Sequence, residues 1–265
     1  MSDLEVQRAV AKLIEKFPIR LLGGLPITVI SRSESAQNFA EHALLRRDRE
    51  LPPFYSTSAN GQVLSMCASD AEIREEFLKA DEIVADGMPM VAASRIRKGF
   101  KLPERVATTD LIHDAAQVAV ERDLTFFMLG ADETSNRLTV ENLQAKYPKL
   151  RIIGRRDGYF GIDDEDAIIA ELNKLKPDIV WIAMGVPREQ QFISRNLEKM
   201  TGVGVLKTSG GLFDFLSGKR SRAPRWMQLI GLEWAYRAIL EPKRLGKRYI
   251  ETNPHALRLL FTKSN

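Results

Sequence analysis

From about Leu22 to about Leu216 the sequence alternates short apolar segments with helical patterns, and this alternation limits the possible folds more than any other feature. Each apolar segment has the length of a buried strand and is followed by a polar or glycine-containing turn and then a helix. Strands joined through helices form a parallel sheet with helices on both faces. The sequence therefore predicts an α/β fold with a Rossmann-like, mostly parallel sheet. The expected strands are Ile27–Ile30, a segment ending at the polar turn Ser56–Gly61, Glu82–Ala85, the runs LTFFMLG, RIIG and DIVWIAMG, and Val203–Leu206.

The alternation stops after Gly218, and helical patterns alone follow. Proline is favoured in the first turn of a helix and Ser or Thr at the N-cap, so these residues locate the expected helix starts. Besides a first helix over residues 3–16, we expect helices capped by Ser33, opened by Thr109 or Asp110, spanning Trp226–Leu240, and started by Pro242 and by Pro254. The chain is therefore divided into an α/β catalytic core of residues 1–217 and a helical appendage of residues 218–265.

The appendage carries the basic charge of the protein. From Lys219 onward there are eleven Lys and Arg against three acids, whereas the preceding residues hold 28 basic and 32 acidic side chains. A local excess of arginines beside tryptophans is typical of segments that contact phosphates or an anionic membrane surface. We therefore expect the appendage to associate with a membrane and to complete the active site.

Composition argues against several other classes of protein. The single cysteine, Cys67, excludes an internal disulfide and is interpreted as a small buried residue on a helix. There is no apolar run of about 18 residues and no signal-peptide apolar region, so neither a membrane span nor a leader is expected. The histidines are too far apart in sequence to indicate a metal site, and Gly130 does not form a GxGxxG fingerprint. We expect no metal and no cofactor.

Polar residues follow the strands at positions where an open α/β sheet binds its ligands. Asp86 ends the strand Glu82–Ala85 and is the carboxylate we select as general base, although an Asp before Gly is also a common turn residue. Ser58, Asn60 and the adjacent Thr57 lie in a polar turn at the same predicted edge, where ligand contact and a purely local Asx or ST turn remain alternatives.

Further candidates lie in later turns and in the appendage. Arg105 and Asp110 form an ion pair or, alternatively, Asp110 only caps its helix; the turn near Pro187 could likewise only start a helix. The Gly210–Gly211 pair allows close backbone approach, as a nucleotide pocket needs, and appendage arginines are suited to a diphosphate. The remaining candidate substrate-binding residues are Gly185, Pro187, Glu189, Gln190, Phe213, Asp214, Arg222, Arg237, Arg244 and Arg248.

Several segments resemble one known family, and the resemblance extends from about Leu22 to about Leu260. These segments are ERVATTDL, DGYFG, GVPREQQF, GGLFDFLSG, RAPRWMQLIGLEWAYR and EPKRLGKRY. They are similar to the WecG/TagA/CpsF family, family 26 of the glycosyltransferases, and the combination RAP, LEW and EP is specific to it.

The resemblance implies an inverting, metal-independent glycosyltransferase of bacterial surface polysaccharide synthesis, of the exopolysaccharide, teichoic acid linkage unit or common antigen type. It implies a UDP-sugar as donor and a polyprenyl-diphosphate-linked saccharide as acceptor, with the enzyme peripheral at the inner, cytoplasmic face of the plasma membrane. Hexosamine, glucose and uronic acid donors all fit. The family's proposed base falls on Asp86, its threonine on Ser58 and its asparagine on Asn60.

The sequence departs from the family pattern at three places. Ser58 replaces the threonine, which keeps the hydroxyl and removes the methyl group. The usual Gly-x-Pro-Lys-Gln-Glu-x-Trp reads GVPREQQF here, so Glu189 and Gln190 are exchanged and Phe192 replaces the tryptophan. Thr108-Thr109 stands where the family often has Gly-Ser or Gly-Thr before Asp110.

The alternative interpretation is a nucleic-acid-binding protein that uses its basic tail, given a pI near 9.1. Such a protein would display a stripe of cations with no pocket. Here the basic residues follow polar turns at strand ends, so we expect no nucleic-acid partner. A homo-oligomer is compatible with the sequence, which does not settle the oligomeric state.

Overall fold

A six-stranded parallel sheet forms the centre of the computed structural model, which describes residues 3–96 and 100–265 apart from the side chains of Asp3 and Arg244. Its strand order is β4-β3-β8-β7-β5-β6. This arrangement confirms the predicted Rossmann-like α/β fold. The strands are β3 (Phe54–Ala59), β4 (Glu82–Ala85), β5 (Thr125–Gly130), β6 (Arg151–Arg156), β7 (Ile179–Ala183) and β8 (Val205–Thr208).

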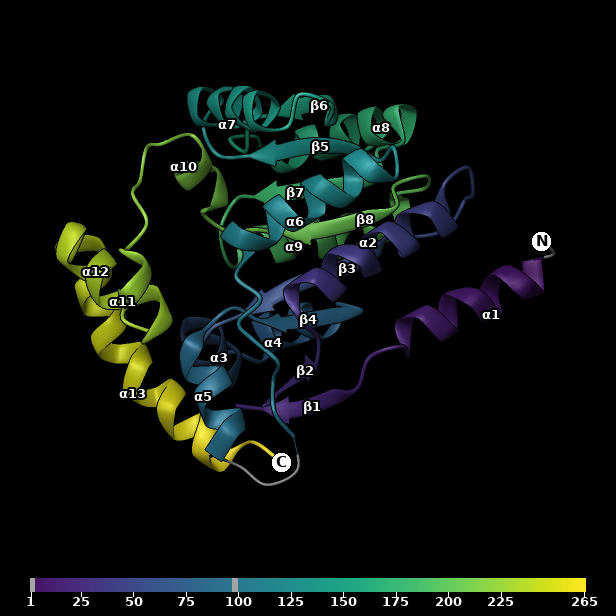
Figure 1. Cartoon of the computed structure of the whole chain (residues 1–265). Helices are drawn as coiled ribbons and strands as arrows, with labels where there is room; N and C mark the ends of the chain where they lie inside the picture. The colour runs from purple at the N-terminus through teal and green to yellow at the C-terminus, as the bar shows by residue number, and fades with distance from the viewer. Residues whose placement is uncertain (1–2, 97–99) are drawn as a thin grey trace.

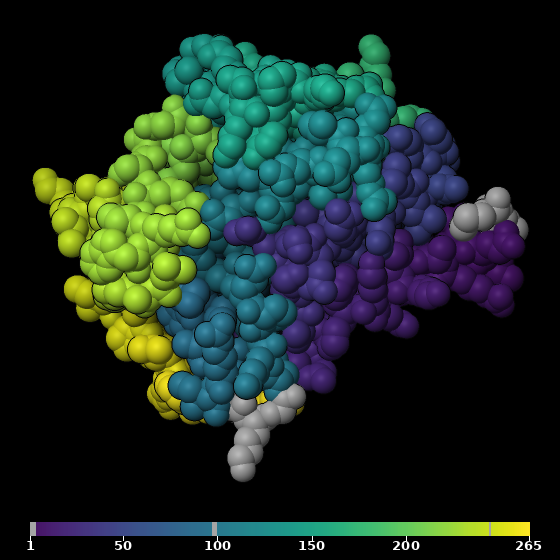
Figure 2. Space-filling view, in the orientation of Figure 1, coloured from purple at the N-terminus to yellow at the C-terminus, as the bar shows by residue number. Residues whose placement is uncertain are grey.

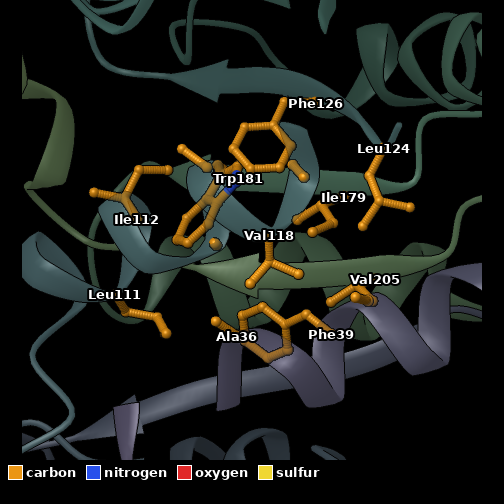
Figure 3. Close-up of a cluster of buried hydrophobic side chains, with 14 of the residues drawn as sticks. Ala36, Phe39, Leu111, Ile112, Val118, Leu124, Phe126, Ile179, Trp181 and Val205 are labelled. Carbon is orange, nitrogen blue, oxygen red and sulfur yellow. The ribbon is translucent and has the colours of Figure 1, made fainter. Parts of the chain in front are cut away.

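Helices cover both faces of this sheet because its strands are apolar on both sides. Alternate residues of β5 and β7 enter different hydrophobic clusters: Phe126 and Trp181 on one face, Phe127 and Val180 on the other. Figure 3 shows the first cluster, where Phe126 and Trp181 meet the helices α2 and α6. The helices of the core are α2 (Arg32–Arg46), α3 (Gly61–Ser69), α4 (Ala71–Leu78), α5 (Met88–Ile96), α6 (Thr108–Glu121), α7 (Glu133–Lys146), α8 (Glu165–Leu175), α9 (Arg188–Asn196) and α10 (Leu212–Leu216), with short 3₁₀ turns at Ile162–Asp164 and Leu197–Lys199.

The N-terminal residues form a helix and a hairpin outside the main sheet. The helix α1 (Asp3–Ile14) confirms the one expected over residues 3–16. The expected strand Ile27–Ile30 is instead β2 (Leu25–Thr28), which pairs antiparallel with β1 (Ile19–Leu22). Gly23 and Gly24 form the turn with φ of 63° and 89°, a backbone conformation that favours glycine.

The C-terminal segment is entirely helical and lies beside the carboxyl ends of the strands. In Figure 1 the arrowheads of β5, β7 and β8 point toward it, and in Figure 2 it forms one side of the molecule. Its elements are α11 (Arg225–Leu229), α12 (Glu233–Leu240), a π-helical turn (Pro242–Gly246) and α13 (Lys247–Thr262).

The last helix is also part of the hydrophobic core. Leu259 and Leu260 belong to the same buried cluster as Leu22 and Leu25 of the hairpin. The backbone N–H of Gly24 donates to the carbonyl of Lys263 at 2.7 Å, which ties the C-terminus to the hairpin turn. Removing residues 218–265 would therefore uncover this cluster. The division into a core of residues 1–217 and an appendage of residues 218–265 stays a prediction.

Four expected helix boundaries are wrong. The helix expected to open at Thr109 or Asp110 begins at Thr108, with Ala107 at its N-cap. Ser31, and not Ser33, caps α2, because Ser31 and Glu34 complete a capping box. The expected helix over 226–240 is interrupted at Gly231, where φ is 78°. Pro254 does not start a helix but lies inside α13, whose apolar contacts beyond the proline hold it in helical form.

Cys67 is buried on α3, as expected, and burial raises the pKa of its thiol to about 12. A thiol of this kind is unreactive at neutral pH.

Candidate active site

A cavity of about 560 Å³ lies at the carboxyl edge of the sheet, closed on its outer side by α12 and α13. The chain goes from β3 outward to β4 and then crosses the sheet to β5, so the strand order reverses near this point. Open α/β sheets bind ligands at such reversals. Nine predicted site residues line the cavity: Ser58, Asn60, Asp86, Arg105, Glu189, Gly210, Gly211, Arg237 and Arg248.

Asp86 enters this cavity directly from the end of β4. Its backbone N–H donates to the carbonyl of Ala59 at 2.8 Å, which continues the parallel pairing one residue beyond the strand. Burial raises the pKa of its carboxyl to about 6, while Arg105 and Lys207 act in the opposite direction. A carboxylate with this pKa is ionised at neutral pH and basic enough to accept a proton from a hydroxyl during reaction.

The end of β3 and the residue after it supply the wall next to Asp86; the strand continues through Ala59, so the residues from Ser56 to Ala59, expected in a polar turn, belong to β3. Ser58 accepts a hydrogen bond from the Lys207 ammonium at 2.8 Å and lies 3.2 Å from the hydroxyl of Thr108. Asn60 caps α3, since its Oδ1 accepts from the backbone N–H of Val63 at 3.2 Å. Asn60 therefore caps α3 and lines the cavity at the same time.

Glu189 and the glycine pair form a third part of the wall. The carboxylate of Glu189 accepts from the backbone N–H groups of Gly210 at 3.0 Å and Met184 at 3.4 Å. Burial raises its pKa to about 7. Gly210 adopts φ of 56°, so the loop that Glu189 holds requires glycine at this position. The exchange with Gln190 thus places a carboxyl group, and not an amide, against the glycine loop.

An ion-pair network joins the core to α12 beside the cavity. Arg105 contacts Glu233 at 2.8 Å and Asp110 at 3.7 Å. Arg222 contacts Asp110 at 2.5 Å and Glu233 at 3.8 Å. Although burial opposes it, hydrogen bonding from Arg222 keeps the pKa of Asp110 below its ordinary value. The sequence alternative in which Arg105 pairs with Asp110 is therefore confirmed, and Arg222 acts from behind the cavity wall.

Arg237 and Arg248 differ from these paired arginines. Both line the cavity, and each guanidinium lies over an aromatic ring, Phe215 for Arg237 and Tyr249 for Arg248. Within residues 3–96 and 100–265, neither arginine forms a salt bridge, and the Nε atom of each is buried without a hydrogen-bond partner. The two guanidinium groups therefore offer uncompensated positive charge to a ligand.

The other predicted residues lie outside the cavity wall. Thr57 is buried and contacts Gln190 at 3.3 Å and the cavity residue Thr208 at 2.7 Å, so Thr57 and Gln190 support the wall from behind. Phe213 belongs to the hydrophobic core, and Asp214 pairs with Arg220 at 3.0 Å. Gly185 and Pro187 flank the cavity residue Val186. The predicted role of Arg244 concerns a side chain outside the described residues.

Sequence reasoning missed several residues of this site. Lys207 and Glu233 carry charge beside Asp86, and Thr108 contacts Ser58. A lysine in the strand Val205–Thr208, immediately before the glycine pair, was a readable signal, because a central strand of a parallel sheet is buried on both faces. Glu233 had no such signal, since an acid in the first turn of a helix is ordinary.

A second hollow, of about 460 Å³, lies at the amino edge of the sheet. The two arginines that line it are neutralised there: Arg47 pairs with Asp178 at 2.9 Å and Arg151 with Asp123 at 3.0 Å. Because these arginines have partners, the hollow does not resemble a site for an anionic substrate.

A cavity at the carboxyl edge of a parallel sheet that combines a carboxyl group of raised pKa with two arginines that form no salt bridge within the described residues is the arrangement of an α/β enzyme. Within that class, the chain belongs to the glycosyl transferase WecG/TagA/CpsF family, whose model matches residues 19–265. The protein is therefore a glycosyltransferase, and the nucleic-acid alternative is not favoured. Its free arginines also face an enclosed cavity and not an open stripe.

Two relatives illustrate the family. The chain is 30% identical over 218 residues to the N-acetylglucosaminyldiphosphoundecaprenol N-acetyl-beta-D-mannosaminyltransferase of Bacillus subtilis (strain 168), with 82% of this chain and 83% of the relative covered. It is 25% identical over 236 residues to the enzyme of the same description from Staphylococcus aureus (strain MRSA252), with 83% and 91% covered.

Proposed function

We propose that the protein transfers a sugar, with inversion, from a UDP-sugar to a polyprenyl-diphosphate-linked saccharide, and that this sugar is N-acetylmannosamine. The placement of Asp86 and the two unpaired arginines Arg237 and Arg248 on the walls of one cavity carries the proposal. The names of the relatives support the acceptor class and a β-linked product. A β-product from an α-linked nucleotide sugar requires inversion.

The reaction needs a base and a counter-charge, and the cavity holds both. In the proposed step, Asp86 takes the proton of the acceptor hydroxyl while the oxygen of that hydroxyl bonds to the anomeric carbon of the donor sugar. The bond from that carbon to UDP breaks, and the bonding electrons leave with the diphosphate. Arg237 and Arg248 stabilise the charge that develops there. Preorganised cations in a partly buried site stabilise such charge more than water does.

Asp86 suits the base role better than the second buried carboxyl group of the cavity, that of Glu189. Both oxygens of Glu189 already accept hydrogen bonds, from Gly210 and Met184 on one oxygen and from Gln190 on the other. Asp86 forms no side-chain ion pair within the described residues, although Arg105 and Lys207 lie near it. Its carboxylate accepts a hydrogen bond from the backbone N–H of Thr108 and lines the cavity, where it can also meet a substrate hydroxyl.

The function is tested by mixing the purified protein with a short-chain lipid-diphosphate N-acetylglucosamine analogue and a panel of UDP-sugars. Release of UDP that needs both substrates, and is fastest with UDP-N-acetylmannosamine, is the expected result. Faster turnover with UDP-glucose or a UDP-uronic acid would show that the assigned donor is wrong. Absence of turnover with every donor would contradict the proposed function.

The same assay tests metal independence, which we propose because the arginines supply the counter-charge. Within the described residues, no cluster of three or more His, Cys, Asp or Glu side chains could hold a metal ion. We expect the rate to stay within about twofold when EDTA is added, since arginine pairs can replace a cation at a diphosphate. Loss of the rate in EDTA and its return with Mg²⁺ would show that a metal takes part.

We also propose that the C-terminal helices dock the enzyme on an anionic membrane at the cytoplasmic face. No helix of residues 3–96 or 100–265 has the length and apolar content needed to cross a bilayer. Large apolar side chains are nevertheless exposed on α11, α12 and α13 and directly after α11, and they are Trp226, Leu229, Ile230, Trp234, Ile239, Leu240, Ile250, Leu257 and Phe261. Leu257 also lines the cavity, so this apolar surface reaches the proposed site of the lipid-linked acceptor.

Replacing Leu229 and Ile230 together by serine should weaken binding to phosphatidylglycerol vesicles at least about tenfold. Each side chain is more than 60% exposed, and burying one fully contributes about 1.5–3 kcal/mol. Vesicle co-sedimentation measures the effect. The matched control replaces Leu4 and Ile162, which are exposed outside the C-terminal helices, and should bind as the unmodified protein does. Equal loss in both variants would contradict the docking surface.

A further inference from the structure

Lys207 is a fully buried lysine one layer behind the cavity wall. Its side chain has no exposed surface, and its ammonium donates to Ser58 at 2.8 Å. We propose that Lys207 is a positioning residue of the transfer, which orients the Ser58 hydroxyl toward the substrate and supports the ionised form of Asp86. This inference rests on the proposed function, since it assigns Lys207 to the same site.

The hydrogen-bond argument follows from the chemistry of an ammonium group. An ammonium donates three hydrogen bonds and accepts none, so Ser58 must be the acceptor in its contact with Lys207. The Ser58 hydroxyl hydrogen is then directed elsewhere, either to the Thr108 hydroxyl at 3.2 Å or into the cavity that Ser58 lines. Lys207 thereby makes Ser58 a donor suited to a sugar or phosphate oxygen.

The charge argument concerns the carboxylates around Lys207. Three carboxylates favour the charged form of Lys207, and they are Glu82 on β4, Asp86 at the end of β4 and Glu189 on α9. Glu82 is fully buried and accepts hydrogen bonds from Ser56 at 2.6 Å, Ser35 at 3.3 Å and Asn38 at 3.4 Å. It is therefore held in place without facing the cavity. Asp86 and Glu189 both line the cavity, but both oxygens of Glu189 are already held by hydrogen bonds from Gly210, Met184 and Gln190.

Four charged groups face Asp86 from the elements packed around it. Arg105 and Lys207 favour its ionised form, and Glu233 opposes that form. Arg222 also interacts with its charge. Arg105 and Arg222 are shared with Asp110 and Glu233, so their charge is partly neutralised. Lys207 supports Asp86 from inside the protein, where solvent does not screen its charge, although Glu82 and Glu189 share that charge.

The test uses a background in which removing the lysine leaves no unpaired Glu82. Glu82→Gln alone is compared with Glu82→Gln combined with Lys207→Met, and kcat/KM is measured from pH 5 to pH 9. Without the lysine charge, the pH below which kcat/KM declines (the acid limb of the profile) should rise by roughly one unit, the low end for loss of an opposite charge. Burial lowers the pKa of Lys207 to about 8, so the comparison is made below pH 8. The ratio of activity at pH 5 to that at pH 7 should fall about fivefold, because a pKa rise from 6 to 7 reduces the ionised fraction about tenfold at pH 5 and only about twofold at pH 7.

The activity ratio separates a positioning role from a structural one. Damage to packing lowers activity equally at both pH values, so an unchanged ratio with reduced activity would overturn the proposal. If the methionine variant does not fold, Lys207→Gln in the same background is the second variant; it keeps a donor for Ser58 and should shift the limb equally.

Asp86→Asn, measured in parallel, distinguishes failure of this inference from failure of the proposed function. If Asp86→Asn is inactive and the limb does not move when Lys207 is removed, only the role of Lys207 is wrong. If Asp86→Asn keeps its activity, the proposed mechanism is wrong, and the charge link to Lys207 is wrong with it.

Discussion

Asp86→Asn should reduce turnover by at least about a hundredfold, the lower range for loss of a general base. Asparagine has nearly the same shape as aspartate, so the cavity and the binding of both substrates should be preserved. It cannot take the proton of the acceptor hydroxyl. Single-turnover measurement of UDP release, at saturating donor and acceptor, reports the chemical step directly. Activity within about threefold of the unmodified protein would contradict the assignment.

The pH dependence of the unmodified enzyme gives independent evidence on the same residue. Burial raises the pKa of Asp86 to about 6, and the base works only when ionised. The value of kcat/KM should therefore be constant near pH 7.5 and fall about tenfold per unit below pH 6, since this profile reports the free enzyme. Asp86→Asn should lack this acid limb.

Stability measurements separate chemistry from unfolding in this variant. The folded pKa of Asp86 is above its ordinary value of 3.8, so the folded protein binds this proton more tightly than the unfolded chain does. The contribution of Asp86 to the free energy of unfolding is thus lost as pH rises from about 4 to 6, and it does not return at higher pH. Asp86→Asn removes this unfavourable ionisation, and its melting temperature at pH 7.5 should equal or exceed that of the unmodified protein.

Glu189→Gln is the matched control for the hundredfold loss. Glutamine still accepts from the N–H groups of Gly210 and Met184, so the glycine loop should keep its shape. We expect a loss of less than about tenfold, because the hydrogen bonds that remain are the ones the loop needs. A larger loss for Glu189→Gln than for Asp86→Asn would make Glu189 the base.

The sequence predicted the sheet well because both faces of its strands are apolar. The strand Glu82–Ala85 was predicted with its observed bounds, and the runs LTFFMLG and DIVWIAMG became the central strands β5 and β7. Boundaries set by tertiary contacts were not predictable. Pro254 reads as a helix start, yet packing of Leu259 and Leu260 beyond it continues α13 through the proline.

The candidate site was predicted where a single strand end determines a residue's position. Ser58 lies near the end of β3, Asn60 follows β3 and Asp86 follows β4, and the parallel register of these two strands brings the three residues to one edge. The partners of the arginines could not be predicted this way. Arg222 and Arg237 belong to the same basic segment, yet Arg222 pairs with Asp110 whereas Arg237 faces the cavity. That difference depends on how the C-terminal helices dock, which no local pattern encodes.

Arg237→Ala combined with Arg248→Ala should weaken UDP binding by at least about a hundredfold. A hydrogen bond to a charged group contributes about 1.5–3 kcal/mol, or roughly tenfold or more for each arginine. Neither side chain has an ion pair within the described residues, so no carboxylate is left unpaired when both are removed. Calorimetry with UDP measures the binding, and turnover should fall further than binding, since charge on the leaving diphosphate is greatest in the transition state.

Arg225→Ala is the control for this pair, because it removes one positive charge from the same segment at an exposed position outside the cavity wall. It should bind UDP as the unmodified protein does. Arg237→Lys tests geometry: lysine keeps the charge but lacks the planar fork of arginine, so binding should be intermediate. If the double variant and Arg225→Ala bind UDP equally well, the arginines of α12 and α13 do not contact the diphosphate. The C-terminal helices would then close the cavity without contributing to the leaving-group site, and their exposed apolar surface would be their main function.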